Sequence, residues 1–272
     1  MTFVAVASIV LYLAATWQLG NRLLTSGGTS SGPHPVILLA PALLGLGLHG
    51  VTLYDTALVG TGLRLSFFNA LSLIGWVVAA LVLVTLRGRT LDNLALFVLP
   101  LTAICVALAA LFPAPDTTAV SQSIGLQVHI TVSVLGYGLL ALAALQAALV
   151  ALQDRLLRRK QVSALLRALP PLTRQESLLF QLIGAGFFFL SLSLASGAMY
   201  VQDLMGQHLL HKTVLSALAW CIFGALLYGR WRHGWRGRPV VRWCLGAFIS
   251  LMLAYFGAKL VLEVILGRTW SG

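Results

Sequence analysis

Four histidines of this sequence fall near the ends of predicted apolar segments, and their ring nitrogens could bind a metal. They are His49, His129, His208 and His211, and the charge pattern described below assigns all four to the outer side of a membrane. His129 and His211 stand in the first turns of predicted helices, where the positive end of the helix dipole disfavours protonation of an imidazole. Because neutral imidazole coordinates transition metals, two such rings facing each other predict axial ligation of haem iron.

Other ionisable residues on the same side offer further roles. If haem binds there, its propionates would reach Lys212 or Arg64. Asp203, near His208, predicts either a helix cap or a carboxylate that orients a histidine. Lys259 and Glu263 stand four residues apart in the last apolar segment, where they either neutralise each other or mark a proton or cation pathway.

Small residues recur at helical spacing in two of the predicted segments. The first set follows His129 and the second lies in the next segment: Ser133 and Gly136, then Gly186, Ser193 and Gly197. Small side chains allow either a flat ring or another helix to approach closely. The pattern favours close helix packing over a binding surface.

The composition predicts the elements that must position these residues. The chain has 272 residues, of which 59% are hydrophobic and 9% charged, whereas an average soluble domain has about 25% charged residues. An ordinary soluble enzyme is therefore excluded, and segments of about 20 apolar residues predict membrane-spanning helices. Eight segments have this character: 3–20, 35–54, 65–86, 91–112, 123–153, 178–201, 210–229 and 241–266.

These segments predict an all-α, polytopic membrane protein with about eight transmembrane helices. We expect residues 1–272 to form a single membrane domain, with spans one to four in 1–112 and spans five to eight in 123–266. The longest connections, 154–177 and 230–242, are too short to be domains of their own. The fifth segment is long enough to project into the aqueous phase.

The basic residues predict the orientation of the chain. Fourteen Lys and Arg residues fall in alternate loops, after spans one, three, five and seven. The positive-inside rule makes these loops cytoplasmic and puts both termini outside. The net charge of +11 is therefore mainly an orientation signal. It predicts a lipid bilayer as partner and no nucleic acid.

Motifs for covalent chemistry do not occur in this sequence. The three cysteines form no CxxC or CxxCH pair, which argues against a disulfide framework, a zinc site and covalently attached haem. The sequence also contains no HExxH, P-loop or GxSxG motif. We name no catalytic residue and expect no reaction of the chain's own.

Several short stretches between residues 126 and 255 carry a family resemblance: 128–133 with 135–137, 169–172, 176–178 with 186–188 and 196–197, 211–213 with 219–220, and 234–237. They resemble the cytochrome c assembly family, the haem-handling membrane proteins that include CcsA, CcmC and HemX. The resemblance implies an external haem-ligating histidine at His129. The partner of His129 on the iron would be His211 or His49, and His211 is nominated by helix geometry alone.

The sequence also departs from the pattern of that family. The family's outer segment is rich in tryptophan, whereas the corresponding residues 200–208 contain none, and residues 260–272 lack the family's second external histidine. A histidine expected late in span seven is replaced near Tyr228. These departures most resemble the short YpjD-like branch of the family, and that resemblance implies a location in the bacterial inner membrane.

Three functions remain open on these observations. The first is a non-catalytic protein that binds haem near the outer leaflet and presents it to apocytochrome c or other cytochrome maturation proteins. The second is a haem-less structural or regulatory subunit that partners another membrane protein, such as an ion transporter. The third is a small-solute transporter that uses Lys259, Glu263 and Asp203.

Overall fold

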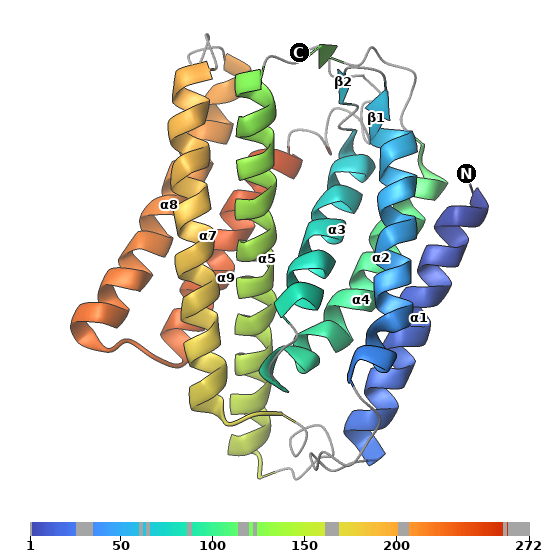
Figure 1. Ribbon diagram of the computed structural model, residues 1–272. Coiled ribbons are helices and arrows are strands. Elements are labelled where there is room, and N and C mark those ends of the chain that lie inside the picture. Colours follow the sequence, from blue (N-terminus) through green and yellow to red (C-terminus); the bar gives the residue numbers. More distant parts are fainter. Residues whose placement is uncertain are drawn as a thin grey trace. The chain divides into compact units, whose positions relative to one another are not determined.

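The chain forms long helices, as the apolar segments predict (Figure 1). The computed structural model describes residues 2–25, 35–59, 62–63, 66–85, 89–113, 120–121, 124–160, 169–200, 207–257 and 260. Within these ranges the helices are α1 (Thr2–Thr25), α2 (Pro35–Ala57), α3 (Phe67–Thr85), α4 (Arg89–Leu111), α5 (Ile124–Arg158), α7 (Leu172–Tyr200), α8 (Gln207–His233) and α9 (Arg238–Met252). A short π-helix, η1 (Leu253–Gly257), continues α9. The all-α prediction is confirmed.

Extended backbone is limited, in the described ranges, to three two-residue strands. They are β1 (Leu58–Val59), β2 (Gly62–Leu63) and β3 (Val120–Ser121). Leu58 pairs with Leu63 and Val59 with Gly62, so β1 and β2 form a minimal antiparallel hairpin.

Seven of these helices are long and apolar enough to cross a membrane. They are α1, α3, α4, α5, α7, α8 and α9 with η1. The helix α2, which contains Pro41, is not among the seven in the described part of the chain. The membrane class is therefore confirmed, and α2 occupies the second predicted span as a helix of 23 residues.

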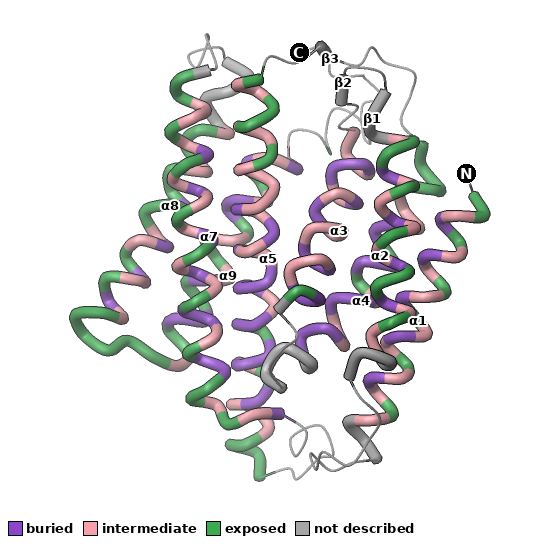
Figure 2. Tube along the Cα trace, in the orientation of Figure 1, coloured by how far each residue is buried: buried purple, intermediate pink, exposed green. Residues whose placement is uncertain are grey.

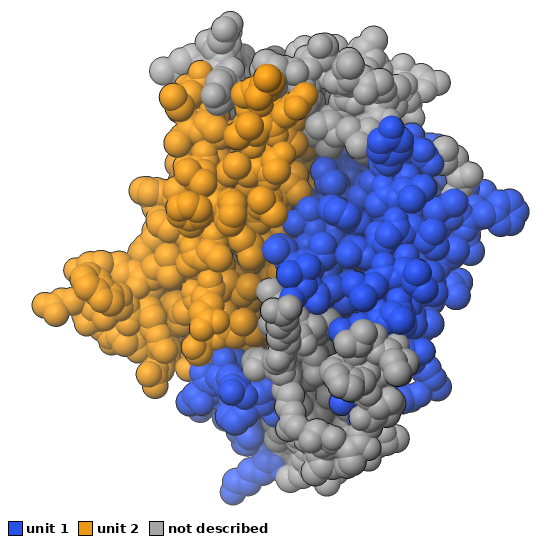
Figure 3. Space-filling model, in the orientation of Figure 1, with its two compact units in different colours: residues 1–119, 152–175 blue, residues 120–151, 176–272 orange. Residues whose placement is uncertain are grey.

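The chain divides into two compact units (Figure 3). Unit 1 contains residues 1–119 and 152–175, and unit 2 contains residues 120–151 and 176–272. The division follows the predicted separation between the first four and last four spans, apart from residues 152–175. That residues 1–272 form a single membrane domain stays a prediction.

Unit 1 is held together by packing of α1 against α2 and α4, and of α3 against α2 and α4. Its buried residues lie mainly on the inward faces of these helices (Figure 2). Side chains also bond to the backbone of neighbouring helices. Ser8 Oγ donates to the Gly45 carbonyl at 3.1 Å, and Trp76 Nε1 donates to the Leu46 carbonyl at 2.9 Å. Such bonds supply specificity where lipid removes most of the hydrophobic driving force.

In unit 2 the predicted small residues allow α5 and α7 to approach closely. A Cβ atom added at Gly136 would lie 3.2 Å from the backbone nitrogen of Leu190, and one added at Gly186 would lie 2.7 Å from Leu140. The prediction of helix packing at these positions is confirmed. A side-chain hydrogen bond also joins α9 to α8: Ser250 Oγ on α9 donates to the carbonyl of Leu215 on α8 at 3.1 Å.

The loop predicted at residues 230–242 is shorter in the structure than predicted. Helix α8 continues to His233 and α9 begins at Arg238, which leaves only residues 234–237 between them. Two features favour the longer helices. Arg230 and Arg232 in the last turn of α8 interact favourably with its dipole, and Pro239 suits the first turn of α9. The connection 154–177 is shorter for the same reason, since α5 ends at Arg158 and α7 begins at Leu172.

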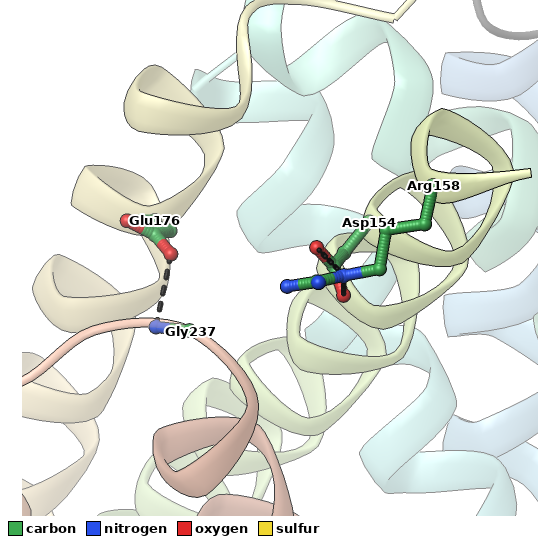
Figure 4. Close-up of polar contacts among 4 residues, drawn as sticks. All are labelled: Asp154, Arg158, Glu176 and Gly237. Carbon is green, nitrogen blue, oxygen red and sulfur yellow. Dashed lines mark hydrogen bonds and ion pairs between the residues drawn. The ribbon is translucent and has the colours of Figure 1, made fainter. Parts of the chain in front are cut away.

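The N-terminus of α9 is capped from another helix of unit 2. Glu176 on α7 is only 9% exposed, and its Oε1 atom accepts the backbone N–H of Gly237 at 3.0 Å (Figure 4). Gly237 is the N-cap residue and adopts φ 74°, a conformation that favours glycine. The contact fixes where α9 begins, because it satisfies a backbone donor that has no partner within the helix.

Candidate functional site

His129 stands in the second turn of α5, beside the last turns of α7. The two helices run antiparallel, so the beginning of α5 and the end of α7 lie at the same end of unit 2 (Figure 1). The Nδ1 atom of His129 lies 2.9 Å from Oγ of Ser196 on α7. The imidazole is half-buried. It is thus held by a polar contact from one side while part of it stays accessible.

Two further serines connect the same turn of α5 to α7. Ser133 Oγ donates to the carbonyl of His129 at 2.6 Å and lies 2.7 Å from Oγ of Ser193. Ser196 Oγ donates to the carbonyl of Ser193 at 3.1 Å. The backbone and the ring of His129 are therefore both tied to the last turns of α7.

Gly197 leaves the space that the imidazole occupies. A Cβ atom added at Gly197 would lie 3.2 Å from Cε1 of His129, which is tighter than ordinary van der Waals contact. The absence of a side chain at this position therefore lets the ring lie against the backbone of α7. The sequence pattern selected Gly197 for helix packing, and the group that packs there is the histidine itself.

The second ring nitrogen, Nε2 of His129, has no hydrogen-bond partner among the described residues. An imidazole held at one nitrogen with the other open is the usual arrangement of a histidine that ligates a metal. The chemistry and placement of this residue therefore fit an axial ligand of haem iron.

His49 has a different environment, in unit 1. It is completely buried, its Nδ1 atom lies 3.3 Å from the hydroxyl of Tyr12, and its Nε2 atom lies 2.8 Å from Oγ of Ser72. Both ring nitrogens are thus occupied by neutral hydroxyl groups. Sequence reasoning did not select Tyr12 or Ser72. A usable signal was the spacing of Ser8 and Tyr12, which places two polar groups on one face of an apolar helix.

The other predicted site residues are only partly within the described chain. The backbone of His208 and His211 lies in the first two turns of α8. This position was predicted for His211, whereas the predicted span began only at residue 210, after His208. The side chains of both histidines are outside the described residues. Lys212 is half-buried on α8. The remaining predictions lie outside the described residues: Asp203, Lys259 and Glu263. Among the residues that are described, no three His, Cys, Asp or Glu side chains gather as a metal cluster.

Comparison with known proteins relates these features to a family. The sequence profile described as cytochrome C assembly protein matches residues 38–266. The chain belongs to this cytochrome c assembly family. The matched range includes His49, His129, His208 and His211, so every candidate ligand lies in the part that the family shares.

Individual relatives agree with this assignment. The inner membrane protein YpjD of Escherichia coli (strain K12) is 31% identical over 226 residues, which cover 82% of this chain and 86% of YpjD. Protein HemX of Brevibacillus brevis is 26% identical over 90% of this chain and 82% of its own length. The cytochrome c biogenesis protein CcsA of Gloeobacter violaceus is 27% identical over 35% of this chain and 29% of its own length. No solved structure matches.

The predicted resemblance to the cytochrome c assembly family and to YpjD is thereby confirmed. Together with the seven apolar helices, it makes the chain a multi-pass protein of the bacterial inner membrane. Membership of the cytochrome c assembly family gives the protein a haem-related role in cytochrome maturation in general.

Proposed function

We propose that this member of the cytochrome c assembly family binds haem near the outer leaflet through Nε2 of His129 and presents it for cytochrome maturation. The observation that carries the proposal is the state of the His129 ring. Its Nδ1 atom is engaged by Ser196 at 2.9 Å, and its Nε2 atom has no partner within the described ranges. A ligand position that is oriented but not satisfied is what an axial ligand requires.

The second axial ligand is proposed to be His211 rather than His49. His211 stands two turns or less from the start of α8, the helix that follows α7 in unit 2. His49 would have to give up a bond to Tyr12 or Ser72 before either nitrogen could reach iron. The cost of leaving a buried hydroxyl without a partner therefore disfavours His49.

The protein's contribution would be binding, orientation and protection of the cofactor. Haem supplies the vinyl groups that form thioether bonds with cytochrome cysteines. The chain would hold the ligand ring through Ser196. Lys212, half-buried on α8, is proposed to pair with a propionate. Apocytochrome c or another maturation protein would be the partner that receives haem.

Haem titration of the purified apo-protein in detergent tests the proposal. We expect a Soret band in the wild-type protein and its loss in His129→Ala. His233→Ala is the matched control, because His233 is exposed at the other end of α8 and its variant should keep the band. A protein that takes up no haem under reducing or oxidising conditions would contradict the proposal.

A haem-less subunit is the alternative that one observation favours. Residues 200–208 contain no tryptophan, so the tryptophan-rich outer segment of the family has no counterpart at this position of the sequence. This alternative predicts co-purification with another membrane protein, such as an ion transporter, and no chromophore in the complex. The same Soret measurement on the complex separates the two functions.

A further inference from the structure

Three serines around His129 form a directed hydrogen-bond chain between α5 and α7. The hydroxyl of Ser133 donates to the carbonyl of His129, and Ser193 Oγ lies 2.7 Å from Ser133 Oγ. Because Ser133 has already used its single proton, Ser193 is the donor in that contact. Ser196 donates to the carbonyl of Ser193 at 3.1 Å.

This chain decides which nitrogen of His129 carries the proton. A serine hydroxyl has one proton, and that of Ser196 is directed to the carbonyl of Ser193. Ser196 Oγ must then accept the 2.9 Å bond from His129, so Nδ1 carries the hydrogen. The opposite tautomer would place a proton on Nε2, for which the described residues provide no acceptor. An unsatisfied donor there costs about 1–3 kcal/mol, so the tautomer with Nδ1–H is favoured.

The tautomer leaves the lone pair of Nε2 available, because no described residue bonds to that nitrogen. Ser196 and Gly197 lie in the same turn of α7: Ser196 holds the ring through a hydrogen bond, and the ring lies so close to the backbone at Gly197 that an added Cβ would be 3.2 Å from Cε1. Rotation of the ring would break the first contact and is limited by the second. Both the protonation state and the direction of the ring are therefore set before a ligand arrives.

We propose that Ser196 is the positioning residue of the haem site, which prepares Nε2 of His129 as the iron ligand. The inference rests on the proposed function and identifies how that site is built. Histidine ligands in proteins commonly donate their second N–H to an acceptor, which fixes the tautomer and raises the basicity of the ligand. Here the acceptor is a serine hydroxyl whose own proton is held by the backbone of α7.

Ser196→Ala, Ser196→Thr and Gly197→Ala test this role by haem titration and by redox titration of the bound iron. Removal of such an outer partner typically weakens metal binding by about 10- to 100-fold, and we expect that loss in Ser196→Ala. The midpoint potential should rise as well, because a less basic imidazole stabilises ferric iron less. Threonine keeps the hydroxyl and should restore both values, whereas Gly197→Ala should weaken binding by displacing the ring.

Ser191→Ala is the matched control on the same helix. The Ser191 hydroxyl contacts Phe187 and Trp220, so its loss perturbs α7 without touching the His129 bond. We expect wild-type affinity and potential in this variant. If Ser196→Ala behaves like Ser191→Ala while His129→Ala loses haem, the positioning role is overturned and the proposed function stands. If the wild-type protein binds no haem, both are overturned.

Discussion

The carboxylate of Glu176 accepts a hydrogen bond from the backbone N–H of Gly237 across 61 residues of sequence. Glu176 is buried near the beginning of α7, and Gly237 begins α9. A charged acceptor at a helix N-terminus is favourable because it satisfies a free N–H and interacts with the positive end of the dipole. This bond thus anchors the tight connection between α8 and α9 to α7.

Glu176→Ala should therefore lower the stability of the protein. The variant leaves the N–H of Gly237 without its partner, which costs about 1–3 kcal/mol. Glu176→Gln keeps an acceptor oxygen and should lose less, because only the charge assistance disappears. The measurement is the free energy of unfolding in mixed detergent and SDS.

The pair Asp154 and Arg158 provides the matched comparison (Figure 4). Arg158 Nε lies 3.1 Å from Asp154 Oδ1, and the two side chains are 63% and 21% exposed, respectively. An exposed pair four residues apart on one helix contributes about 0.3–0.5 kcal/mol. Arg158→Gln should therefore be nearly neutral. A loss in Arg158→Gln equal to that in Glu176→Ala would mean that the buried cap has no special weight.

The close contact between α5 and α7 predicts that a single methyl group added at Gly186 lowers the stability of the protein. A Cβ at Gly186 would lie 2.7 Å from Cδ2 and Cγ of Leu140, and Leu140 is completely buried. Gly186→Ala should destabilise the protein by about 1–3 kcal/mol, the usual cost of overpacking. Gly246→Ala on α9 is the control, because no atom lies within 4 Å of its added Cβ.

We expect the change in stability to have opposite signs in Gly186→Ala and Gly246→Ala, because helix propensity favours alanine where no contact opposes it. Alanine is favoured over glycine within a helix by about 1 kcal/mol, so Gly246→Ala should be neutral or stabilising. Unfolding in SDS measures both variants under the same conditions. If Gly186→Ala is also neutral, Leu140 has room to move and the close approach of α5 and α7 does not limit packing.

The sequence predicted the helices and part of this packing, for identifiable physical reasons. An apolar segment of bilayer length has to be helical, because lipid offers no other partner to its backbone. The glycines at positions 136 and 186 were recognisable because small residues at helical spacing form a continuous face. The end of α8 was mispredicted, because arginines that look like a loop also stabilise a helix C-terminus. The start of α9 was mispredicted, because Pro239 suits the first turn of a helix.

The partner of His129 was not predictable from sequence alone. Ser196 is 67 residues away, and the rotation of α7 about its axis decides which of its polar residues meets α5. The pattern selected Ser193 and Gly197 but omitted Ser196, although all three lie on one helix face. For His49 the sequence predicted a possible ligand, whereas the structure engages both its nitrogens with Tyr12 and Ser72.

The environment of His49 predicts that replacing this residue lowers the stability of the protein but does not abolish haem binding. His49→Leu removes two interhelical bonds, each worth about 0.6 kcal/mol on average in a membrane protein, and leaves the hydroxyls of Tyr12 and Ser72 without that partner. The thermal unfolding midpoint should fall, while the Soret band of the remaining folded protein should not shift. Tyr12→Phe should show a smaller decrease. A Soret shift with unchanged thermal stability would instead make His49 an iron ligand.

The predicted orientation is tested by the two ends of α5. Pro113 precedes this helix and Arg159 follows it, and the basic residues beyond Arg159 assign that end to the cytoplasm. Alkaline phosphatase, which is active only outside the cytoplasm, should be active when fused after Pro113 and inactive when fused after Arg159. Green fluorescent protein at the same two positions should give the opposite pattern.

The two fusions separate an error in orientation from an error in the number of spans. Equal activity after Pro113 and Arg159 would show that α5 does not cross the membrane, although it is 35 residues long. Reversed activity would place His129 at the cytoplasmic end of α5, so haem would have to be delivered from the inner leaflet. The expected pattern puts His129, Ser196 and the start of α8 on the outer side, where we propose that haem is bound.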